Sequence, residues 1–352
     1  MVKNIGSVRA KLLINQFGSA EAVFLASKSA LSKVNGISKV IIESLKSSTT
    51  LENAKRELEF VRKNNIKLLY YLDAEYPNRL RPYDDAPICL YYKGNVSLNK
   101  KKHVSIVGTR TPTEKGKWIC EKLIEDLKSQ DVTIISGLAY GVDVTAHKTA
   151  LRVGLPTLGV VAHGLDTIYP SVHKSIAKEM AVQGGILTEF GRGVKPERDR
   201  FPARNRIIAM LSDALVVVES KESGGSMITA NFGNDYSKDV FAIPGRIDDL
   251  HSVGCNKLIK EHKAFLLDSA EELVRMMRWE PKTTKEVQRS LFLDLTKEEQ
   301  KVIETIKIGM GGIDELCHTI GLSRSEVASI LLDMELKGLI RSLPGSRYMV
   351  LS

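Results

Sequence analysis

Nine short apolar runs rich in β-branched residues, separated by stretches of helical periodicity, occupy residues 51–280 and limit the fold most strongly. They are Ile66–Tyr71, Ile88–Tyr92, His103–Val107, Val132–Ile135, Thr157–Ala162, Ile186–Thr188, Ala214–Glu219, Val240–Ile243 and Ala264–Leu267. Strands that alternate with helices are typical of a mainly parallel sheet. A continuously apolar run such as Leu215-Val216-Val217-Val218 indicates a strand that is covered on both faces. The sequence therefore predicts an α/β domain over residues 51–280, an extended Rossmann-like doubly wound sheet.

The first 50 residues contain two similar phrases, Asn4–Val8 and Val34–Ser38, in which a Gly turn leads into an apolar-periodic helix. Such a turn exposes main-chain N–H groups at the helix start, where helix-hairpin-helix modules hold nucleic-acid phosphates. Ordinary capping by Gly and Ser is the alternative. The first phrase has no helix before it in the sequence. We therefore predict an all-α helix-hairpin-helix module over residues 1–50, with its first hairpin incomplete.

The pattern changes again after the sheet region. Residues 281–295 combine Pro, polar residues and a short apolar cluster, which indicates a linker. Three amphipathic helices follow at Leu295–Ile306, Ile313–Ile320 and Ser323–Lys337, the last with Ser323 and Glu326 in capping-box spacing. Residues 338–350 have the pattern of a hairpin with a Pro-Gly turn. Residues 296–352 are thus predicted to form a winged-helix domain.

Composition excludes several classes of protein. No run of 18 apolar residues and no secretory signal pattern is present, so we expect a cytoplasmic protein without a membrane span. Cys89, Cys120, Cys255 and Cys317 are too dispersed for a zinc site, and we expect reduced thiols. The net charge of +9 suits a polyanionic partner. Residues 1–50 carry +5 of it, whereas residues 296–352 carry −1.

Three turns that combine Gly with a hydroxyl residue follow predicted strands and lead into helices. They contain Gly108-Thr109-Arg110, then Ser136-Gly137 within the segment 136–143, and Ser223-Gly224-Gly225-Ser226 with Thr229 one helical turn later. In open α/β sheets the ligand site lies beyond the carboxyl ends of the strands. Gly lets a phosphate approach the main chain closely, and helix N-termini supply free N–H donors. The three turns therefore predict an anion-binding floor at one edge of the sheet.

Four cations accompany these turns: Arg110, Lys174, Arg204 and Arg206. One mononucleotide needs one or two of them, so four favour the several phosphates of a nucleic-acid strand. The alternative is that an Arg at a helix start pairs with a core carboxylate such as Glu189 or Glu219.

Known catalytic and cofactor motifs are missing. The spacing from Gly108 to Lys117-Trp118 is too long for a P-loop, and Trp stands where Ser or Thr would hold magnesium. No GxGxxG, GxSxG or HExxH pattern occurs, and the histidines have no paired-ligand spacing. We interpret His147 and His163 as structural. The sequence predicts no catalytic residue, no cofactor and no metal.

The order of the phrases resembles the bacterial DprA/Smf family (DNA processing protein A). The phrases that carry the resemblance are Val107–Arg110, Ser136–His147, Gly164–Pro170, Phe201–Ala209, Ser223–Ala230 and Pro244-Gly245. They span the whole sheet domain, and both end domains match the family's modules. The resemblance implies a protein that binds and protects single-stranded DNA, loads the recombinase RecA on it during natural transformation and recombination, and performs no known reaction.

Site residues carry over by position. The family's strand-binding Gly-Ser-Arg phrase falls on Gly108, Thr109 and Arg110, with Thr in place of Ser, and its basic residue after Tyr-Pro falls on Lys174. Ser171 stands where some members have Lys, one helical turn away. The family's homodimer contact falls at about residues 255–267, including Asn256, Lys257, Leu266 and Leu267. Its apolar residues Leu258, Ile259, Phe265, Leu266 and Leu267 suit a two-fold interface and are equally consistent with a core.

Further hypotheses concern partners and rival functions. The near-neutral winged helix favours a protein-interaction or duplex-accessory module over the main DNA site. Gln288, Leu291 and Phe292 resemble a sliding-clamp docking peptide, with a Leu-Phe contact to a domain as the alternative. Single-strand-binding protein is a further candidate partner. The rival to a DNA-binding protein is a nucleotide phosphoribohydrolase-like enzyme on a related fold, and a duplex-specific regulator is a third class.

Overall fold

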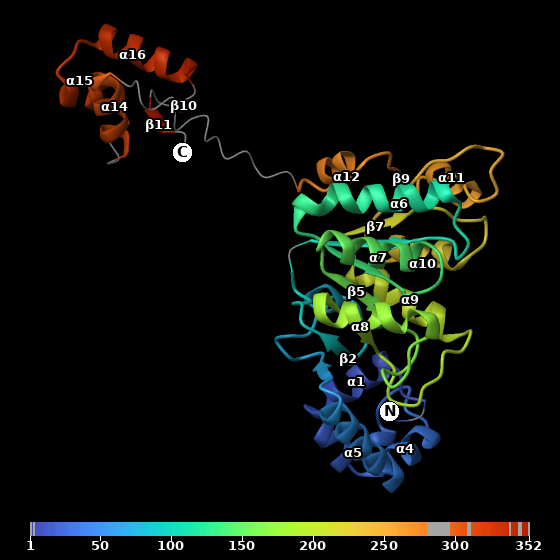
Figure 1. Ribbon diagram of the computed structural model, residues 1–352. Coiled ribbons are helices and arrows are strands. Elements are labelled where there is room, and N and C mark those ends of the chain that lie inside the picture. Colours follow the sequence, from blue (N-terminus) through green and yellow to red (C-terminus); the bar gives the residue numbers. More distant parts are fainter. Residues whose placement is uncertain are drawn as a thin grey trace. The chain divides into compact units, whose positions relative to one another are not determined.

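The computed structural model describes residues 2, 4–100, 102–279, 296–307, 311–337, 339–343 and 347–350. The chain divides into two compact units, Met1–Trp279 and Glu280–Ser352 (Figure 1). The predicted linker 281–295, with Gln288, Leu291 and Phe292, lies outside the described residues.

All nine predicted strands are present in one sheet of the first unit. They are β1 (Lys67–Tyr70), β2 (Cys89–Gly94), β3 (His103–Val107), β4 (Thr133–Ser136), β5 (Thr157–Val160), β6 (Gly184–Thr188), β7 (Ala214–Val217), β8 (Asp239–Ala242) and β9 (Phe265–Leu266). Their order is β1-β2-β6-β5-β4-β3-β7-β8-β9. β1 and β2 run antiparallel to their neighbours, and the pairs from β6 to β9 are parallel. This confirms the predicted, mainly parallel α/β fold.

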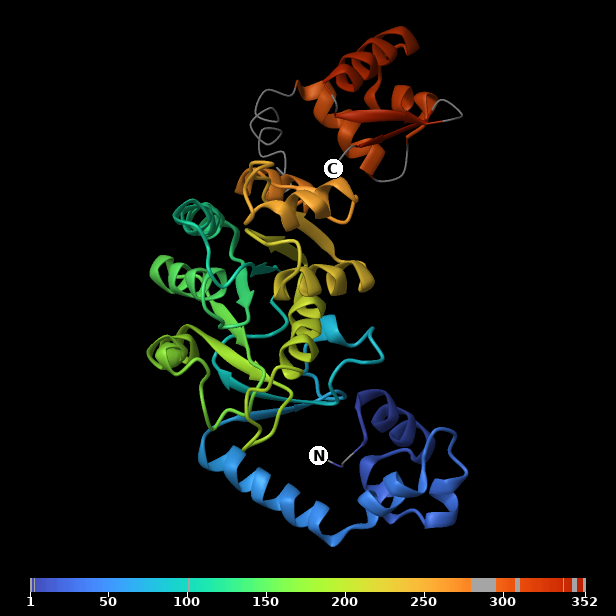
Figure 2. The ribbon, with the colours of Figure 1, turned by 90° about the vertical axis from the view of Figure 1, so that its right-hand side faces the viewer.

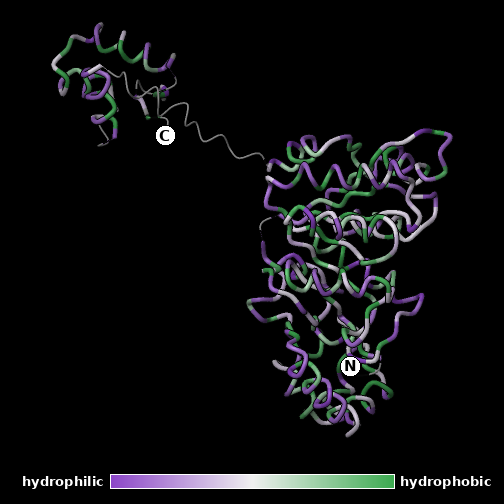
Figure 3. The backbone as a smooth tube through the Cα atoms, in the orientation of Figure 1, coloured by the Kyte–Doolittle hydropathy of each residue, from purple (hydrophilic) through white to green (hydrophobic). Residues whose placement is uncertain are grey.

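Helices cover both faces of the sheet. Successive side chains of a strand point to opposite sides, and in the central strands both sets are apolar and must be buried. In β7, Leu215 and Val217 belong to one buried cluster, and Ala214 and Val216 to the other. Figure 2 shows the sheet from its edge, with helices on either side. One layer contains α6 (Glu114–Asp126), α7 (Val142–Val153), α8 (Lys174–Gln183) and α12 (Ala270–Met276); the other contains α9 (Arg200–Leu211), α10 (Gly225–Asp235) and α11 (Val253–Lys260). Hydrophobic and hydrophilic residues alternate along these elements (Figure 3). The short 3₁₀ helices are η1 (Asn78–Leu80), η2 (Leu127–Gln130) and η3 (Ser171–His173).

Five helices precede the sheet: α1 (Ser7–Phe17), α2 (Ala20–Leu25), α3 (Lys28–Ser32), α4 (Lys39–Lys46) and α5 (Ser48–Lys63). The second Gly phrase joins α3 to α4, with Gly36 at φ +80°, and the first leads into α1. These helices have their own small core, but α5 runs through residue 50 without a break. The Lys11 ammonium of α1 also donates to the Tyr83 carbonyl at 2.7 Å. The helices belong to the same compact unit as the sheet, and α5 spans the predicted boundary at residue 50.

The second unit is the predicted winged helix. It contains α14 (Lys297–Lys307), α15 (Ile313–Ile320), α16 (Arg324–Leu336) and the hairpin β10 (Ile340–Leu343) and β11 (Arg347–Val350). Ser323 and Glu326 form the predicted capping box at the start of α16. Among the residues that the structure describes, no helix is both long and apolar enough to cross a bilayer.

The order of the strands in the sheet indicates where a ligand site is expected. From β3 the chain builds β4, β5 and β6 on one side, and it then returns to place β7, β8 and β9 on the other. The order of the strands thus reverses between β3 and β7. In doubly wound sheets a crevice opens at this reversal, beyond the carboxyl ends of the two strands.

Two buried histidines make the stability of this fold sensitive to pH. Burial lowers the pKa of His103 to about 4 and that of His147 to about 3. Both side chains are 0% exposed, and no described residue is a partner of either Nε2. As the pH falls below about 6.5, these two histidines become protonated in the unfolded chain but stay neutral in the folded chain.

We therefore expect the free energy of unfolding to be highest above pH 6.5 and to fall by about 2 kcal/mol per histidine between pH 7 and 5. Urea denaturation at a series of pH values measures this. His147→Gln should flatten the dependence, and an unchanged pH profile in that variant would contradict the assignment.

Candidate nucleic-acid interface

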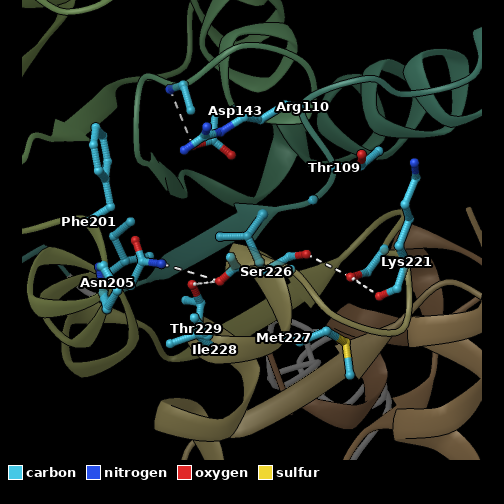
Figure 4. A pocket seen from close by; sticks show the side chains of 18 of the residues that line it. Thr109, Arg110, Asp143, Phe201, Asn205, Lys221, Ser226, Met227, Ile228 and Thr229 are labelled. Carbon is cyan, nitrogen blue, oxygen red and sulfur yellow. Dashed lines mark hydrogen bonds between the residues drawn. The ribbon is translucent and has the colours of Figure 1, made fainter. Parts of the chain in front are cut away.

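A cleft of about 730 Å³ opens at the reversal between β3 and β7. Figure 4 shows Arg110 and Thr109 above it, Phe201 and Asn205 to the left, α10 below and Lys221 to the right. Its lining comes from the β3 turn, from Ala139 and Asp143 after β4, from Arg198 and the start of α9, and from the segment between β7 and α10. Parts of all three predicted Gly turns therefore face one cavity.

The turn after β3 is held from both sides. The Thr109 N–H donates to the Glu219 carbonyl at 2.8 Å, and the Val142 N–H donates to the Thr109 carbonyl at 3.2 Å. A Cβ on Gly108 would lie 2.5 Å from Val142 Cγ2, so the close approach requires Gly there. The main chain of this turn is thus fixed by its neighbours on both sides.

Arg110 projects from this fixed turn into solvent. Its guanidinium lies 5.6 Å from the centre of the Phe201 ring. Its side chain is exposed, and among the described residues none forms an ion pair with it. A cation held by a ring face and left without a carboxylate is available to an external anion.

Arg204 occupies the interior instead. It is 4% exposed, and it donates to the carbonyls of Gly137, at 2.7 Å, and Val160. Burial lowers its pKa to about 10, and the buried Asp143 carboxylate opposes this shift. The fold therefore uses Arg204 to tie α9 to the ends of β4 and β5.

In the middle Gly turn, at residues 136–143, the polar groups form hydrogen bonds within the protein. The Ser136 hydroxyl is 0% exposed and donates to the Ile106 carbonyl at 2.6 Å. The Gly137 and Ala139 N–H groups donate to Asp143 at 3.1 and 3.3 Å. Burial raises the pKa of Asp143, and the Arg204 charge opposes the rise. The Ser136 hydroxyl and the Gly137 N–H therefore stabilise the turn from inside the protein.

Arg206 pairs with Glu189, one of the two core carboxylates that the sequence offers as alternatives to a phosphate. The guanidinium lies 2.5 Å from the Glu189 carboxylate and 2.7 Å from the Asp85 carbonyl, with 14% of the side chain exposed. Glu219 has a different role, because it accepts from the Thr113 N–H at 2.9 Å before α6. Neither Arg204 nor Arg206 reaches the cleft as a free cation.

The third turn opens into the cleft at the start of α10. Ser223, Gly224 and Gly225 are exposed, and no side chain caps this helix. Ser226 and Thr229 are buried beneath them, with the Ser226 hydroxyl 2.8 Å from that of Ser220 and the Thr229 hydroxyl donating to the Gly225 carbonyl at 3.0 Å. The exposed part of this turn therefore presents uncapped main-chain N–H groups to a ligand.

Lys174 lies at the other end of the same sheet edge. It is the exposed first residue of α8, which follows β5. A small pocket of about 90 Å³, lined in part by Tyr140, Tyr169 and Phe201, lies between the ends of β4 and β5. Arg110 and Phe201 line both this pocket and the larger cleft.

The residues that line the cleft but were missed by sequence reasoning include two cations, an aromatic ring and an amide: Arg198, Lys221, Phe201 and Asn205. Phe201 and Asn205 lie within a phrase used for the family resemblance, and Lys221 lies two residues before a predicted Gly turn. A search for cations next to each turn would have found Lys221. Nothing local marks Arg198.

The predicted dimer residues divide between surface and interior. Leu266 is 48% exposed on the edge strand β9, beside Phe265 at 52%, whereas Leu267 is 0% exposed within the core. Asn256 exchanges hydrogen bonds with the main chain of Gly245. Lys257 pairs with Glu222 at 3.1 Å. Of the four predicted dimer residues, Leu266 is thus the one that presents an exposed apolar side chain, with Phe265 beside it.

In the described ranges, no three His, Cys, Asp or Glu side chains are placed to hold a metal ion. All four cysteines are free thiols, with Cys120 and Cys255 buried. The cleft brings together the exposed Arg110 and the uncapped start of α10.

Two family models match the sequence. Residues 67–278 match the model of DNA recombination-mediator protein A, and residues 292–346 match the DprA winged helix domain. Protein Smf of Synechocystis is 31% identical, over 99% of this chain and 96% of its own. DNA processing protein DprA of Streptococcus pneumoniae is 41% identical, over 58% of this chain and 71% of its own.

Solved structures agree with these matches. The crystal structure of the Streptococcus pneumoniae DprA has a TM-score of 0.66 at 33% identity, over 77% of this chain and 98% of that one. DNA processing protein A of Helicobacter pylori, studied for its single-stranded DNA binding mode, has a TM-score of 0.55 at 29% identity, over 60% of this chain and 95% of that one.

Proposed function

Because this chain belongs to the family of DNA recombination-mediator protein A, we propose that it binds single-stranded DNA without sequence specificity at the cleft between β3 and β7. The observation that carries the proposal is Arg110, a cation on a fixed turn, stacked on Phe201 and without a carboxylate partner among the described residues. Phosphates would contact residues 108–110, Lys174 and the exposed start of α10. Arg204 and Arg206 would support this surface from inside.

Phosphate contacts have two consequences for binding. They carry no sequence information, so affinity should vary little with base composition. They also displace counterions, so affinity should fall as salt rises. An anisotropy titration with a single strand and with a duplex of the same sequence tests the proposal. Preference for the single strand supports it, and equal or tighter binding of the duplex overturns it.

We further propose that the protein protects the strand and loads RecA on it, as a cytoplasmic homodimer acting in natural transformation and recombination. The support is membership of the family, together with the exposed Phe265 and Leu266 on an edge strand. RecA assembly on a strand coated with single-strand-binding protein measures the loading. The proposal requires faster assembly when this protein is added, and equal rates with and without it would end the idea.

A binding role, as opposed to nucleotide hydrolysis, is our proposal for the turn at residues 223–229. The turn lacks the Pro-Gly-Gly-x-Gly-Thr sequence and the following Glu of the phosphoribohydrolases. Incubation with nucleoside monophosphates and chromatography for free base tests this. Release of base at a rate proportional to protein would establish the enzyme instead.

The winged helix should not be needed for binding the strand. Both basic residues at the ends of α16 are engaged, Arg324 with Asp314 at 3.6 Å and Lys337 with Glu299 at 2.7 Å. Removal of residues 296–352 should therefore leave the affinity for a single strand within about twofold at moderate salt, since only phosphate-contacting cations contribute strongly. An anisotropy titration of the truncated and full-length chains measures this, and loss of binding in the truncated chain would contradict it.

A further inference from the structure

Lys221 and Arg198 are two cations of the cleft that the proposed function does not use. Both are exposed and line it, Lys221 from the segment between β7 and α10, and Arg198 from the segment before α9. In the described parts of the chain neither has an ion-pair partner. Unpaired cations around a cleft raise the local potential for a polyanion.

The surroundings of Lys221 keep it unpaired and in place. Its neighbour Glu222 is bound by Lys257 at 3.1 Å, so the adjacent carboxylate is occupied. The Lys221 carbonyl accepts from the Ser220 hydroxyl at 2.9 Å, and the Ser220 carbonyl accepts from the Gly254 N–H at 2.8 Å. The base of the side chain is therefore fixed to the start of α11, while its ammonium group remains free.

Negative charge at the cleft is also neutralised within the protein. Asp143 is the one carboxylate among the residues that line it. That carboxylate is 8% exposed and accepts from two main-chain N–H groups. Arg204 adds a compensating charge. An entering phosphate therefore meets cations and N–H donors without an exposed carboxylate.

Strand order places the cations in a row. Lys174 follows β5, Arg110 follows β3 and Lys221 follows β7, in the sheet order β5-β4-β3-β7. β3 and β7 are paired up to Val107 and Val217, and the Thr109 N–H bonds to the Glu219 carbonyl. With about 4.8 Å between strands, the ends of β5 and β7 lie about 14 Å apart, which is the span of several nucleotides.

We propose that the bound strand continues past Arg110 through the cleft towards β7, where Arg198, from the segment before α9, and Lys221, after β7, hold its next phosphates. This rests on the proposed function and adds two contacts and a path to it. A strand enclosed in this way has no room for its complement, so the path also accounts for selection of a single strand over a duplex.

The test compares Lys221→Ala and Arg198→Ala with Lys128→Ala, in the full-length protein. Lys128 is the matched control, because it is an exposed Lys on η2, at the amino-end edge of the sheet before β4. The probes are fluorescent oligothymidylates, one just long enough for the Lys174–Arg110 segment and one much longer. Each cleft variant should weaken binding of the long probe about three- to tenfold and make the salt slope shallower by about 0.7. The short probe should bind as it does to the unmodified protein.

Three outcomes separate this inference from the function on which it rests. If both cleft variants bind the long probe with unchanged affinity and slope while Arg110→Ala weakens it, the path is wrong and the proposed function stands. If Lys128→Ala costs as much as Lys221→Ala, the effect is one of net charge, and the inference is overturned. If Arg110→Ala also binds both probes normally, the proposed function itself fails.

Discussion

Replacing Arg110 by Ala should weaken binding of single-stranded DNA about ten- to a hundredfold for every sequence tested. A hydrogen bond between a charged donor and a phosphate contributes about 1.5–3 kcal/mol. Arg110 offers it from a turn whose main chain is held by both β7 and α7, so little order has to be gained on binding. Fluorescence anisotropy with strands of differing base composition measures the loss.

Arg110→Lys is the informative companion of that variant. Lys keeps the charge but loses the planar fork and most of the stacking on Phe201, so the affinity should lie between those of Arg110→Ala and the unmodified protein. Unchanged affinity in Arg110→Ala would exclude the β3 turn as the strand-binding site. A loss confined to one sequence would mean that Arg110 reads a base.

Replacing Arg204 by Met should lower the free energy of unfolding by about 3–5 kcal/mol. The change leaves Asp143 buried without the opposing charge, and it removes donors from the Gly137 and Val160 carbonyls. Chemical denaturation followed by circular dichroism measures it. A second change, Asp143→Asn, should recover part of the loss, because it removes the uncompensated charge.

Arg198→Met is the control for Arg204→Met. It makes the same chemical change six residues earlier, at an exposed side chain, and should alter the free energy of unfolding by no more than about 0.5 kcal/mol. If Arg204→Met proved as stable as Arg198→Met, then Arg204 would not brace the site, and a direct contact with the strand would again be its best explanation.

The strands could be predicted because their signal is local. A stretch such as 214–218 must be apolar on both faces, whatever its neighbours in the sheet, and each run in the sequence corresponds to a strand. The Gly turns were found for a similar reason. Where the main chain turns tightly before a helix, a side chain often does not fit, and the Gly that results is visible in a short window of sequence. At Gly108, for example, a Cβ would lie 2.5 Å from Val142 Cγ2.

The roles of the arginines could not be predicted, because they depend on partners distant in the chain. Arg110 and Arg204 both stand near the start of a helical segment in the sequence. Both guanidinium groups lie over the Phe201 ring, but the fold brings the carbonyls of Gly137 and Val160 to Arg204 and leaves Arg110 exposed. The position of the boundary near residue 50 could not be predicted for a similar reason. Helix α5 spans that residue, and helical periodicity alone does not indicate whether a helix packs with the preceding module or with the following one.

The most direct test of a strand held by its phosphates is the salt dependence of single-strand affinity. A plot of the logarithm of the binding constant against the logarithm of salt concentration should be linear, with a slope of about −2 or steeper, since each phosphate contact on a single strand contributes about −0.7. A slope near zero would contradict phosphate binding at this cleft.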